Sequence, residues 1–477
     1  MRIIILGAGQ VGASVAEGLV SEDNDITLVD SDASRLQLLQ DRLDLRTVCG
    51  NAASPSVLRD AGADDADLLI AVTQNDQSNL VACKLAQSVF NIPTRMARLR
   101  SPDFLDDKTL LSNENFAVDY AICPERVISE YIRNLIEFPE ALQVMYFAGG
   151  RVCLVAVRAY EGGLLVGKPI KEMRSHLPPD KDARIAAIFR NDQAVTPEGD
   201  TLIQAGDEVF VLAAAEDIRQ VMLELRRMTA PVRRIMIGGA GNIGLRVAAS
   251  LEQRYEVKII EHQMGRAELA ANRLEKTLVL CGDTTDEALL DQENVADMDL
   301  FLALTNDDEN NIMSASLAKR MGCKRVVAIV NRRAYAQMIQ GGPIDIAISP
   351  AQISIGSVLA RVRRGDVAAV HSLRRGAAEA LELVAHGDAN SSKVIGRRIA
   401  DIPWPHGVTV AAIVRDFEHV EVLRVRDDGT VDRRAGHVVI AHGETVIEAG
   451  DHVILFCLSK ELVRKVEALF QVAVSFF

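Results

Sequence analysis

The sequence predicts two tandem α/β domains, each a doubly wound parallel sheet followed by a small β-rich α+β module. Three observations lead to this fold class. One long segment of the chain repeats at a fixed offset, and apolar strand patterns alternate with amphipathic helix patterns inside each repeat. After each alternating stretch the sequence becomes rich in strand and turn signals.

The repeat links the start of the chain to its middle. Residues 1–30, MRIIILGAGQVGASVAEGLVSEDNDITLVD, correspond to residues 232–261, VRRIMIGGAGNIGLRVAASLEQRYEVKIIE. At an offset of 232 residues the coinciding pairs are Gly7 and Gly239, Gly9 and Gly241, Gly12 and Gly244, Gly50 and Gly282, Thr73 and Thr305, Asp76 and Asp308, and Asn79 and Asn311. One offset held over this distance indicates duplicated domains.

Within the first copy, short apolar runs alternate with helical patterns, as in a parallel sheet. Strands are predicted over 2–7, 25–30, 46–50, 66–73 and 94–99, and helices over 10–20, 34–43, 55–62 and 76–89. In the last of these helices, Leu80, Val81, Leu85 and Val89 keep helical spacing. We therefore expect this helix to turn these side chains toward the core.

The β-rich stretches also correspond to each other. ARIAAIFRND at 183–192 matches VTVAAIVRDF at 408–417, and IQAGDEVFVL at 203–212 matches IEAGDHVILF at 447–456. The second copy holds 19 more residues between these runs, and we expect an added hairpin near 421–439. These changes of pattern place four domains at 1–135, 136–230, 231–365 and 366–477.

Composition excludes several classes of protein. The net charge of −13 argues against a nucleic-acid partner, because such proteins normally present a basic surface. No apolar stretch approaches the length of a membrane span, and the chain opens directly on a strand, so we expect a cytoplasmic protein. Seven cysteines without a CxxC pair predict reduced thiols and no metal site, with Cys49 and Cys281 as small buried residues at strand ends.

The glycine loop of each copy lies between a strand and a helix, the context in which GxGxxG binds a dinucleotide. The first glycine permits a tight turn, the second lets the backbone approach a pyrophosphate, and the third lets helix and strand pack closely. The loop residues are Gly7, Gly9, Gln10, Val11 and Gly12 in the first copy, and Gly239, Gly241, Asn242, Ile243 and Gly244 in the second. A domain that keeps its glycines for packing alone is the alternative.

An acidic residue follows the second strand of each copy. Asp30 lies 21 residues after Gly9, and Glu261 lies 20 residues after Gly241. At this spacing a carboxylate accepts hydrogen bonds from ribose hydroxyls. Because it would repel a 2′-phosphate, NAD or an adenine nucleotide is favoured over NADP.

A second shared run, VTQNDQSN at 72–79 and LTNDDENN at 304–311, follows a strand and precedes a helix. Ligands of open α/β sheets bind at this edge. We expect Thr73, Asp76, Thr305 and Asp308 to cap the helix and to face the ligand. Helix capping alone is the alternative.

The two copies differ where the next strand ends. The first reads ARLRSPDF, with Arg98 and Arg100, and the second reads AIVNRRAY, with Ile329 and Asn331 in their places. Guanidinium groups suit phosphates. The first site is therefore predicted to hold ATP or ADP and the second NAD(H), unless these arginines form ordinary surface or interface pairs.

Catalytic groups for a dehydrogenase are not apparent in the sequence. The first histidine is His176, so the first nucleotide-type domain has none, and the second has only His262, next to Glu261. Neither GxSxG nor HExxH occurs. We therefore predict no catalytic residues, and an NAD-dependent oxidoreductase with unrecognised catalytic groups is the alternative.

Taken together, GAGQVG, the acid after the second strand, VTQNDQSN, ARLR and IFRND…PEGDTLIQAGDEVFVL resemble the RCK (KTN) family, over almost the whole chain. The family usually has an aspartate after the glycine of the third strand. Asp283 keeps it, whereas Asn51 departs from the pattern in the first copy. The resemblance implies that both positions contact the ligand.

The resemblance also implies a function. RCK domains regulate potassium channels and transporters, so we expect a regulatory subunit that binds NAD(H) and ATP or ADP and gates potassium uptake. It would lie on the cytoplasmic face of the inner membrane, beneath an integral membrane potassium-translocating subunit. Four chains would form a homotetrameric gating ring. A cytosolic regulator of another potassium transport system is the second alternative.

Overall fold

The computed structural model describes all residues except 21–23, 106, 108, 227–230, 333–334, 336–338, 340–341, 343, 364–366, 375–376, 418–436 and 473–477. Contacts group the chain into two compact units. The first contains Met1–Arg133 and Val232–Leu359, and the second contains Asn134–Pro231 and Ala360–Phe477. The domain boundaries predicted near 135, 230 and 365 stay predictions. Among the described residues, no helix is both long enough and apolar enough to cross a bilayer.

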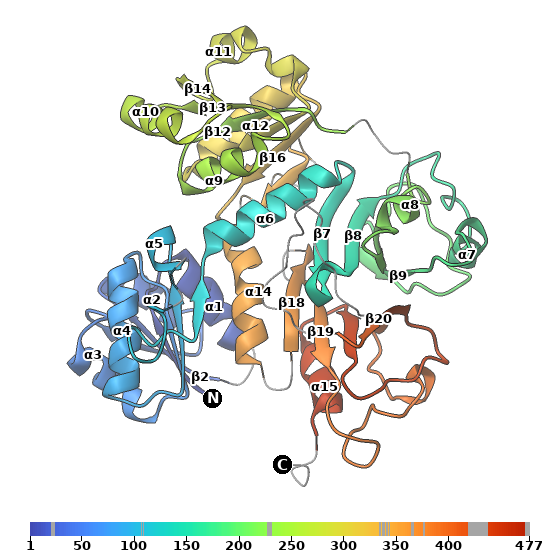
Figure 1. The fold of residues 1–477 in the computed structure, drawn as a ribbon, viewed down its shortest axis with the longest axis horizontal. Helices are drawn as coiled ribbons and strands as arrows, with labels where there is room; N and C mark the ends of the chain where they lie inside the picture. Colours follow the sequence, from blue (N-terminus) through green and yellow to red (C-terminus); the bar gives the residue numbers. More distant parts are fainter. Residues whose placement is uncertain are drawn as a thin grey trace. The chain divides into compact units, whose positions relative to one another are not determined.

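The first parallel sheet has the strand order β3-β2-β1-β4-β5-β6 (Figure 1). Its strands are β1 (Arg2–Leu6), β2 (Asp25–Asp30), β3 (Arg46–Cys49), β4 (Leu68–Ala71), β5 (Thr94–Arg98) and β6 (Tyr120–Ile122). The connecting elements are α1 (Gln10–Val20), α2 (Ala33–Gln40), α3 (Pro55–Asp60), the 3₁₀ turn η1 (Ala63–Asp65), α4 (Asp76–Ser88), α5 (Pro102–Leu105) and α6 (Pro124–Glu137). This confirms the predicted doubly wound fold.

The second parallel sheet repeats this order as β14-β13-β12-β15-β16-β17. Its strands are β12 (Arg234–Gly238), β13 (Glu256–Glu261), β14 (Leu278–Cys281), β15 (Leu300–Ala303), β16 (Arg325–Ile329) and β17 (Ile346–Ile348). The connecting elements are α9 (Asn242–Leu251), α10 (Met264–Arg273), α11 (Glu287–Gln292), the 3₁₀ turn η4 (Val295–Asp297), α12 (Asp308–Arg320) and α14 (Pro350–Val362).

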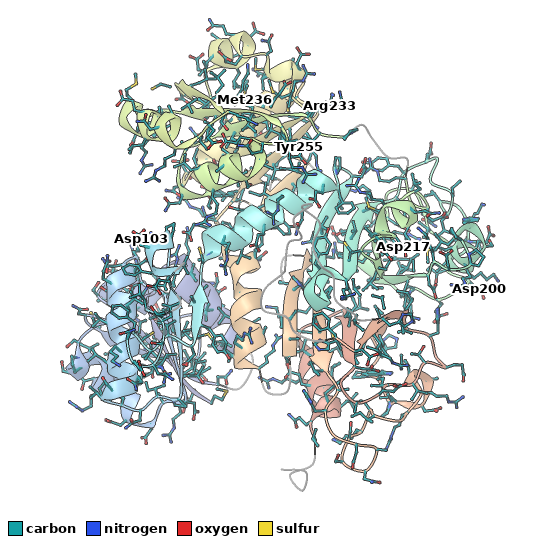
Figure 2. The ribbon with its side chains drawn as sticks, in the orientation of Figure 1. Asp103, Asp200, Asp217, Arg233, Met236 and Tyr255 are labelled. Atoms are coloured by element: carbon teal, nitrogen blue, oxygen red, sulfur yellow. The ribbon has the colours of Figure 1, made fainter. Side chains whose placement is uncertain are left out.

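Continuous apolar runs explain the central strands. Ile3, Ile4, Ile5 and Leu6 of β1 are all buried, as expected for a parallel strand that is covered on both faces. In the second sheet, Met236 of β12 is fully buried, whereas Arg233, just before the strand, is exposed (Figure 2). Burial therefore sets in where the apolar run begins.

Helix α4 buries a different stripe from the one predicted. Leu80 is buried, but Val81 and Val89 are 43% and 46% exposed. The buried face carries small side chains, such as Ala82 and Ala86, which let the helix lie close to the sheet. The expectation for Val81 and Val89 was wrong because they lie on the neighbouring stripe of the helix.

The sheet edges also differ from expectation. β6 and β17 are sixth strands that sequence analysis missed, since three residues are too few to show a strand pattern. Cys49 and Cys281 end β3 and β14 and are exposed, not buried. The reason is that both strands lie at the outer edge of their sheets.

The second unit contains two antiparallel sheets, ordered β10-β9-β11-β8-β7 and β18-β19-β22-β20-β21. The first comprises β7 (Ala141–Phe147), β8 (Val152–Arg158), β9 (Ala183–Arg190), β10 (Gln193–Val195) and β11 (Glu208–Ala214), with α7 (Met173–His176), α8 (Ile218–Met222) and the 3₁₀ turns η2 (Ala148–Gly150) and η3 (Ile170–Glu172). The second comprises β18 (Val367–Leu373), β19 (Ala378–Val384), β20 (Val408–Arg415), β21 (His437–Ile440) and β22 (His452–Cys457), with η6 (Ile399–Asp401) and α15 (Glu461–Phe470).

These sheets confirm the β-rich modules, although sequence analysis missed β7 and β18. The expected hairpin at 421–439 falls mostly outside the described residues, and its last three residues belong to β21. The two modules share one hydrophobic core. Phe147 and Phe210 of the first module lie in the same buried cluster as Ala380 and Phe456 of the second.

A buried polar contact also joins the two modules. Glu382 on β19 is 3% exposed, and its Oε2 accepts the N–H of Ala148, 2.9 Å away, at the end of β7. Its Oε1 lies 2.6 Å from Nδ1 of His452 on β22. A buried carboxylate needs such partners, so this contact fixes the register of one module on the other.

We predict that Glu382→Ala destabilises the second unit by roughly 1–3 kcal/mol, because the buried Ala148 N–H loses its acceptor. The single tryptophan, Trp404, lies in this unit near Phe470, so its fluorescence reports urea unfolding there. Glu444→Ala removes an exposed carboxylate paired with Arg398 and serves as the control. Equal unfolding midpoints for the two variants would contradict the prediction.

Candidate functional site

Both glycine loops have the geometry that their spacing predicts. Gly7 has φ +105° and Gly239 has φ +99°, a left-handed conformation that favours glycine. A Cβ on Gly12 would lie 1.8 Å from the carbonyl oxygen of Gly7, and a Cβ on Gly244 would lie 1.9 Å from that of Gly239. The third glycine therefore seats the helix directly on the end of the strand.

The middle glycine of each loop faces open space. A Cβ on Gly9 or on Gly241 would have no neighbouring heavy atom within 4 Å. Helices α1 and α9 begin immediately afterwards, and the first N–H groups of a helix have no acceptor inside it. Each loop is thus a cradle with room for a ligand backbone and with N–H groups and a helix dipole suited to phosphate.

The acids after the second strand brace these loops. Asp30 accepts the N–H of Ala8 at 2.6 Å and that of Asp32 at 2.9 Å. Glu261 accepts the N–H of Ala240 at 2.9 Å and that of Gln263 at 3.0 Å. Asp30 is half-buried, whereas Glu261 is only 3% exposed. Each carboxylate oxygen keeps a further lone pair for a ribose hydroxyl.

The residues after the third strands play matching local roles. Asn51 Oδ1 accepts the N–H of Ala53 at 2.9 Å, and Asp283 Oδ1 accepts the N–H of Thr285 at 2.8 Å. The hydrogen bonds from Thr285 hold the pKa of Asp283 below its usual value. The exchange of aspartate for asparagine therefore preserves the turn and removes one negative charge from the first site.

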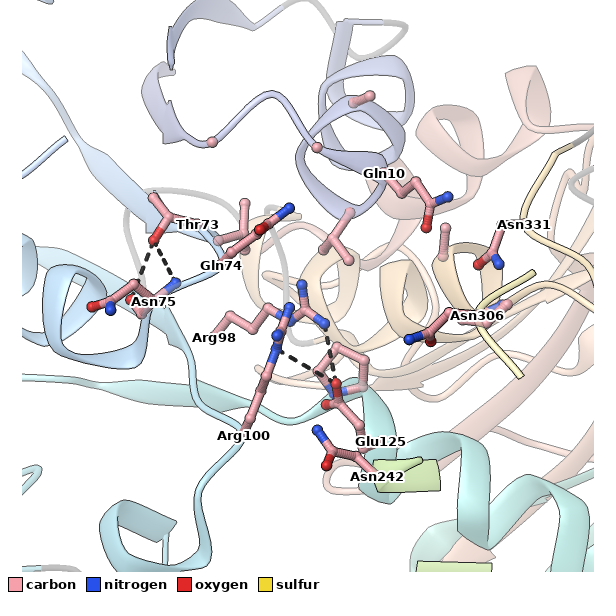
Figure 3. Close-up of a pocket in the computed structure, with 18 of the residues that line it drawn as sticks. Gln10, Thr73, Gln74, Asn75, Arg98, Arg100, Glu125, Asn242, Asn306 and Asn331 are labelled. Atoms are coloured by element: carbon pink, nitrogen blue, oxygen red, sulfur yellow. Dashed lines mark hydrogen bonds and ion pairs between the residues drawn. The ribbon is translucent and has the colours of Figure 1, made fainter. Parts of the chain in front are cut away.

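Both glycine loops line one cavity of about 1450 Å³ within the first unit. From the first copy the lining includes Gly7, Gly9, Gln10, Val11, Asp30, Asn51, Thr73, Arg98 and Arg100, and from the second Gly241, Asn242, Ile243, Thr305 and Asn331. Figure 3 shows Gln10, Asn242, Asn306 and Asn331 around the same space. Glu261, Asp283, Asp76 and Asp308 do not line it.

The threonines of the shared run are held by a buried asparagine. Asn79 is fully buried, and its Oδ1 accepts from the N–H and the hydroxyl of Thr73 at 3.0 and 2.7 Å. Its Nδ2 donates to the carbonyl of Arg98 at 2.8 Å. Asn311 repeats these contacts with Thr305 and Ile329. This side chain therefore fixes the ends of two adjacent strands relative to each other.

The aspartates of the run hold backbone. Asp76 Oδ2 accepts the N–H groups of Arg100 and Ser101 at 2.8 and 2.9 Å, and Asp308 accepts those of Asn331 and Arg332. The helix cap that sequence analysis assigned to Thr73 and Asp76 comes from Asn75 in the first copy. We infer that Asp76 and Asp308 position the ligand-facing segment, and direct ligand contact by them stays a prediction.

Arg98 and Arg100 meet one carboxylate. Arg98 Nη2 lies 3.1 Å from Glu125 Oε1, and Arg100 Nε lies 3.7 Å from the same oxygen (Figure 3). Burial lowers the pKa of the Arg98 guanidinium, and the negative charge of Glu125 opposes that shift. The alternative of an ordinary surface pair does not describe Arg98, whose side chain is 14% exposed.

Comparison with known proteins places these features in a family. The TrkA-N domain pattern matches residues 3–124 and 235–350, and the TrkA-C domain pattern matches residues 154–226 and 388–471. The Trk system potassium uptake protein TrkA of Halomonas elongata is 53% identical over 477 residues and is covered in full. The chain belongs to the TrkA family. The TrkA of Vibrio alginolyticus is 52% identical over 472 residues, 99% of both chains.

Solved structures agree on the fold of this TrkA family member. The GsuK channel has a TM-score of 0.62 at 17% identity, covering 98% of this chain and 78% of that chain. The GsuK RCK domain has a TM-score of 0.60 at 17% identity, covering 98% and 94%. At such identity the similarity concerns the fold, and it confirms the predicted RCK architecture of tandem parallel sheets and β-rich modules.

Sequence reasoning missed the residues that support the TrkA-type site. Asn79 and Asn311 coincide in the repeat, and that coincidence was their only signal. Glu125 has no acidic counterpart, because Ala351 stands one residue after the proline that opens α14, as Glu125 does in α6. Only the fold brings Glu125 to the arginines, which precede it by more than twenty residues.

We predict that Asn79→Ala destabilises the first unit by roughly 2 kcal/mol or more, because the Thr73 N–H and the Arg98 carbonyl lose their partner. Gln77→Ala, at an exposed position of the same helix, is the control. Urea unfolding followed by far-ultraviolet circular dichroism measures both. If the two variants unfold at the same urea concentration, the buried asparagine does not brace the strand ends.

Proposed function

We propose that the chain is the peripheral regulatory subunit of a Trk-type potassium transporter. The observation that carries this proposal is its full-length match, at 53% identity, to a Trk system potassium uptake protein. Its partner would be an integral membrane subunit of the TrkH or TrkG type, and it would lie at the cytoplasmic face of the inner membrane. Four chains would assemble into a gating ring with eight nucleotide domains.

We further propose that the two glycine cradles bind NAD(H) and ATP or ADP. The open space at Gly9 and Gly241 and the helix N-termini beside them support phosphate binding. Asp30 and Glu261 favour an unmodified ribose, because a 2′-phosphate would meet a carboxylate. When bound, the nucleotide brings only negative charge and shape. The chain holds, orients and senses it.

The sites differ in the charge that faces a terminal phosphate. Arg98 and Arg100 line the cavity in the first copy, whereas Ile329 and Asn331 line it in the second. A guanidinium gains most from phosphates beyond the β position, because their charge is dense. The first site therefore prefers ATP or ADP, and the second prefers NAD(H).

Gating follows from a shift of populations. A nucleotide that fits one conformation of the ring better than another moves the equilibrium between them, and the membrane partner follows. The difference in affinity between the two conformations limits the effect, so tight binding by itself opens nothing. Any effect of ATP on NADH affinity must recur with the same factor in reverse.

An NAD-dependent oxidoreductase is the alternative from another class, and a regulator of a different potassium system is the alternative within regulation. The described residues around the cavity include no histidine, so a proton donor beside a nicotinamide has no clear source there. Turnover of a nucleotide or a 2-hydroxy acid would favour the enzyme. Co-purification with another potassium-conducting membrane protein would favour the second alternative.

The decisive experiment measures potassium flux through the membrane partner in vesicles. The full chain is added with NADH, NAD, ADP or ATP, each separately, and flux without the chain is the control. We expect flux to depend on the chain and to differ between nucleotides. Flux that ignores both the chain and every nucleotide would refute the proposed function.

We predict that Gly9→Val and Gly241→Val each abolish nucleotide binding at one site while the chain stays folded, since the new side chain enters the cradle and its Cβ meets no protein atom. Gly12→Val is the contrasting variant and should lose stability, because its Cβ collides with the Gly7 carbonyl. Calorimetric titration and urea unfolding measure the two effects. Unchanged binding in both cradle variants would show that the loops serve packing alone.

We predict that Arg100→Ala weakens ATP binding roughly ten- to a hundredfold through loss of a charge-assisted contact, and weakens NADH less. The measurement uses chains that carry Gly241→Val, so that only the first site binds. Asn331→Ala in chains with Gly9→Val is the matched control at the second site. If both single-site chains rank ATP and NADH in the same order, the sites are not specialised.

A further inference from the structure

The contact between Arg98, Arg100 and Glu125 is unusual for a surface ion pair. The Glu125 side chain is 11% exposed and the Arg98 side chain 14%, so both charges are largely removed from water. One carboxylate thus faces two guanidinium groups. Charge is not balanced among these three side chains, so a second anion would be stabilised beside them.

Hydrogen bonding within the cluster is also incomplete. Glu125 Oε2, Arg98 Nε and Arg100 Nε are buried and have no hydrogen-bond partner. Most buried polar atoms in folded proteins have a partner, so such a group of atoms calls for a functional reason. All three residues line the cavity that receives the glycine loops.

The second copy lacks the whole cluster. Ile329 and Asn331 replace the two arginines, and Ala351 occupies the place of Glu125 at the start of α14. The loss of the carboxylate together with the guanidinium groups indicates that Glu125 serves the arginines and is not needed for the turn into the helix. The helix itself forms in both copies.

We propose that Glu125 is an internal counter-anion, which holds Arg98 and Arg100 in the nucleotide-free state and gives way when a nucleotide phosphate takes its place. This inference deepens the proposed function, because it rests on ATP or ADP binding at the first site. A carboxylate and a phosphate compete for the same fork of N–H donors. Glu125 therefore sets the affinity for phosphate and restricts binding to ligands whose charge can displace it.

The position of Glu125 gives this exchange a route out of the site. Glu125 lies in the first turn of α6, and α6 carries the chain from the first unit, which ends at Arg133, into the second, which begins at Asn134. Releasing Glu125 removes a tie between the end of β5 and this helix. A phosphate would thus loosen the first turn of the helix that joins the two units.

The test compares Glu125→Gln with the unaltered residue in full-length chains that carry Gly241→Val. The amide of this variant keeps an acceptor for Arg98 but removes the negative charge. Glu130→Gln, an exposed position on the same helix, is the matched control, and Glu125→Ala is a second variant. ATP, ADP and AMP are titrated with a chelator and again with Mg²⁺, and urea unfolding verifies that each chain is folded.

We expect Glu125→Gln to tighten ATP binding about tenfold, ADP binding less and AMP binding not at all, with the control unchanged. Hydrogen exchange over the first two turns of α6 should rise when ATP is added to the Glu125 chain and stay level in Glu125→Gln. If the Glu125 chain binds none of the three nucleotides, the proposed function of the first site fails instead.

Two results would overturn the inference while leaving nucleotide binding intact. One is equal ATP affinity in the Glu125 and Glu125→Gln chains, which would make the carboxylate a bystander. The other is weaker ATP binding by Glu125→Gln in Mg²⁺ alone, which would mean that the carboxylate holds a cation beside the phosphates and cooperates with them.

Discussion

The close approach of helix to strand at the third glycine of each loop is the constraint on which the rest depends. A single Cβ at Gly12 or Gly244 would collide with a carbonyl oxygen, at 1.8 and 1.9 Å. Because this space stays empty, the helix N-terminus points at the carboxyl edge of the sheet, where the other ligand-facing groups gather. The acids after the second strands then tie the loops to the neighbouring strands.

A second layer of contacts keeps that edge in order. The buried Asn79 and Asp76 bind the loop after β4 to the residues that end β5, and Asn311 and Asp308 do the same in the second copy. The duplicated framework is thus nearly identical in both halves. What differs is the side chains it presents, so a shared scaffold carries two unlike sites.

The fold and the cradles were predictable from the sequence because they depend on local patterns: apolar runs, helical periodicity and glycine spacing. The arginine difference was visible for the same reason. Glu125 was not, because its meaning depends on a meeting across more than twenty residues of chain. Val81 and Cys49 were misjudged because burial depends on which stripe of a helix or edge of a sheet the neighbours cover, and periodicity alone does not tell.

The core shared by the two β-rich modules bears on how such a chain can change over generations. Phe147 and Phe210 from one copy and Phe456 from the other lie in a single buried cluster. Neither copy can be deleted without exposing the other copy's part of that cluster to water, where large apolar patches favour association. The duplication is therefore locked in. Separate genes for the halves would yield an obligate heterodimer, whereas one chain guarantees equal numbers of both halves and leaves each nucleotide site free to diverge.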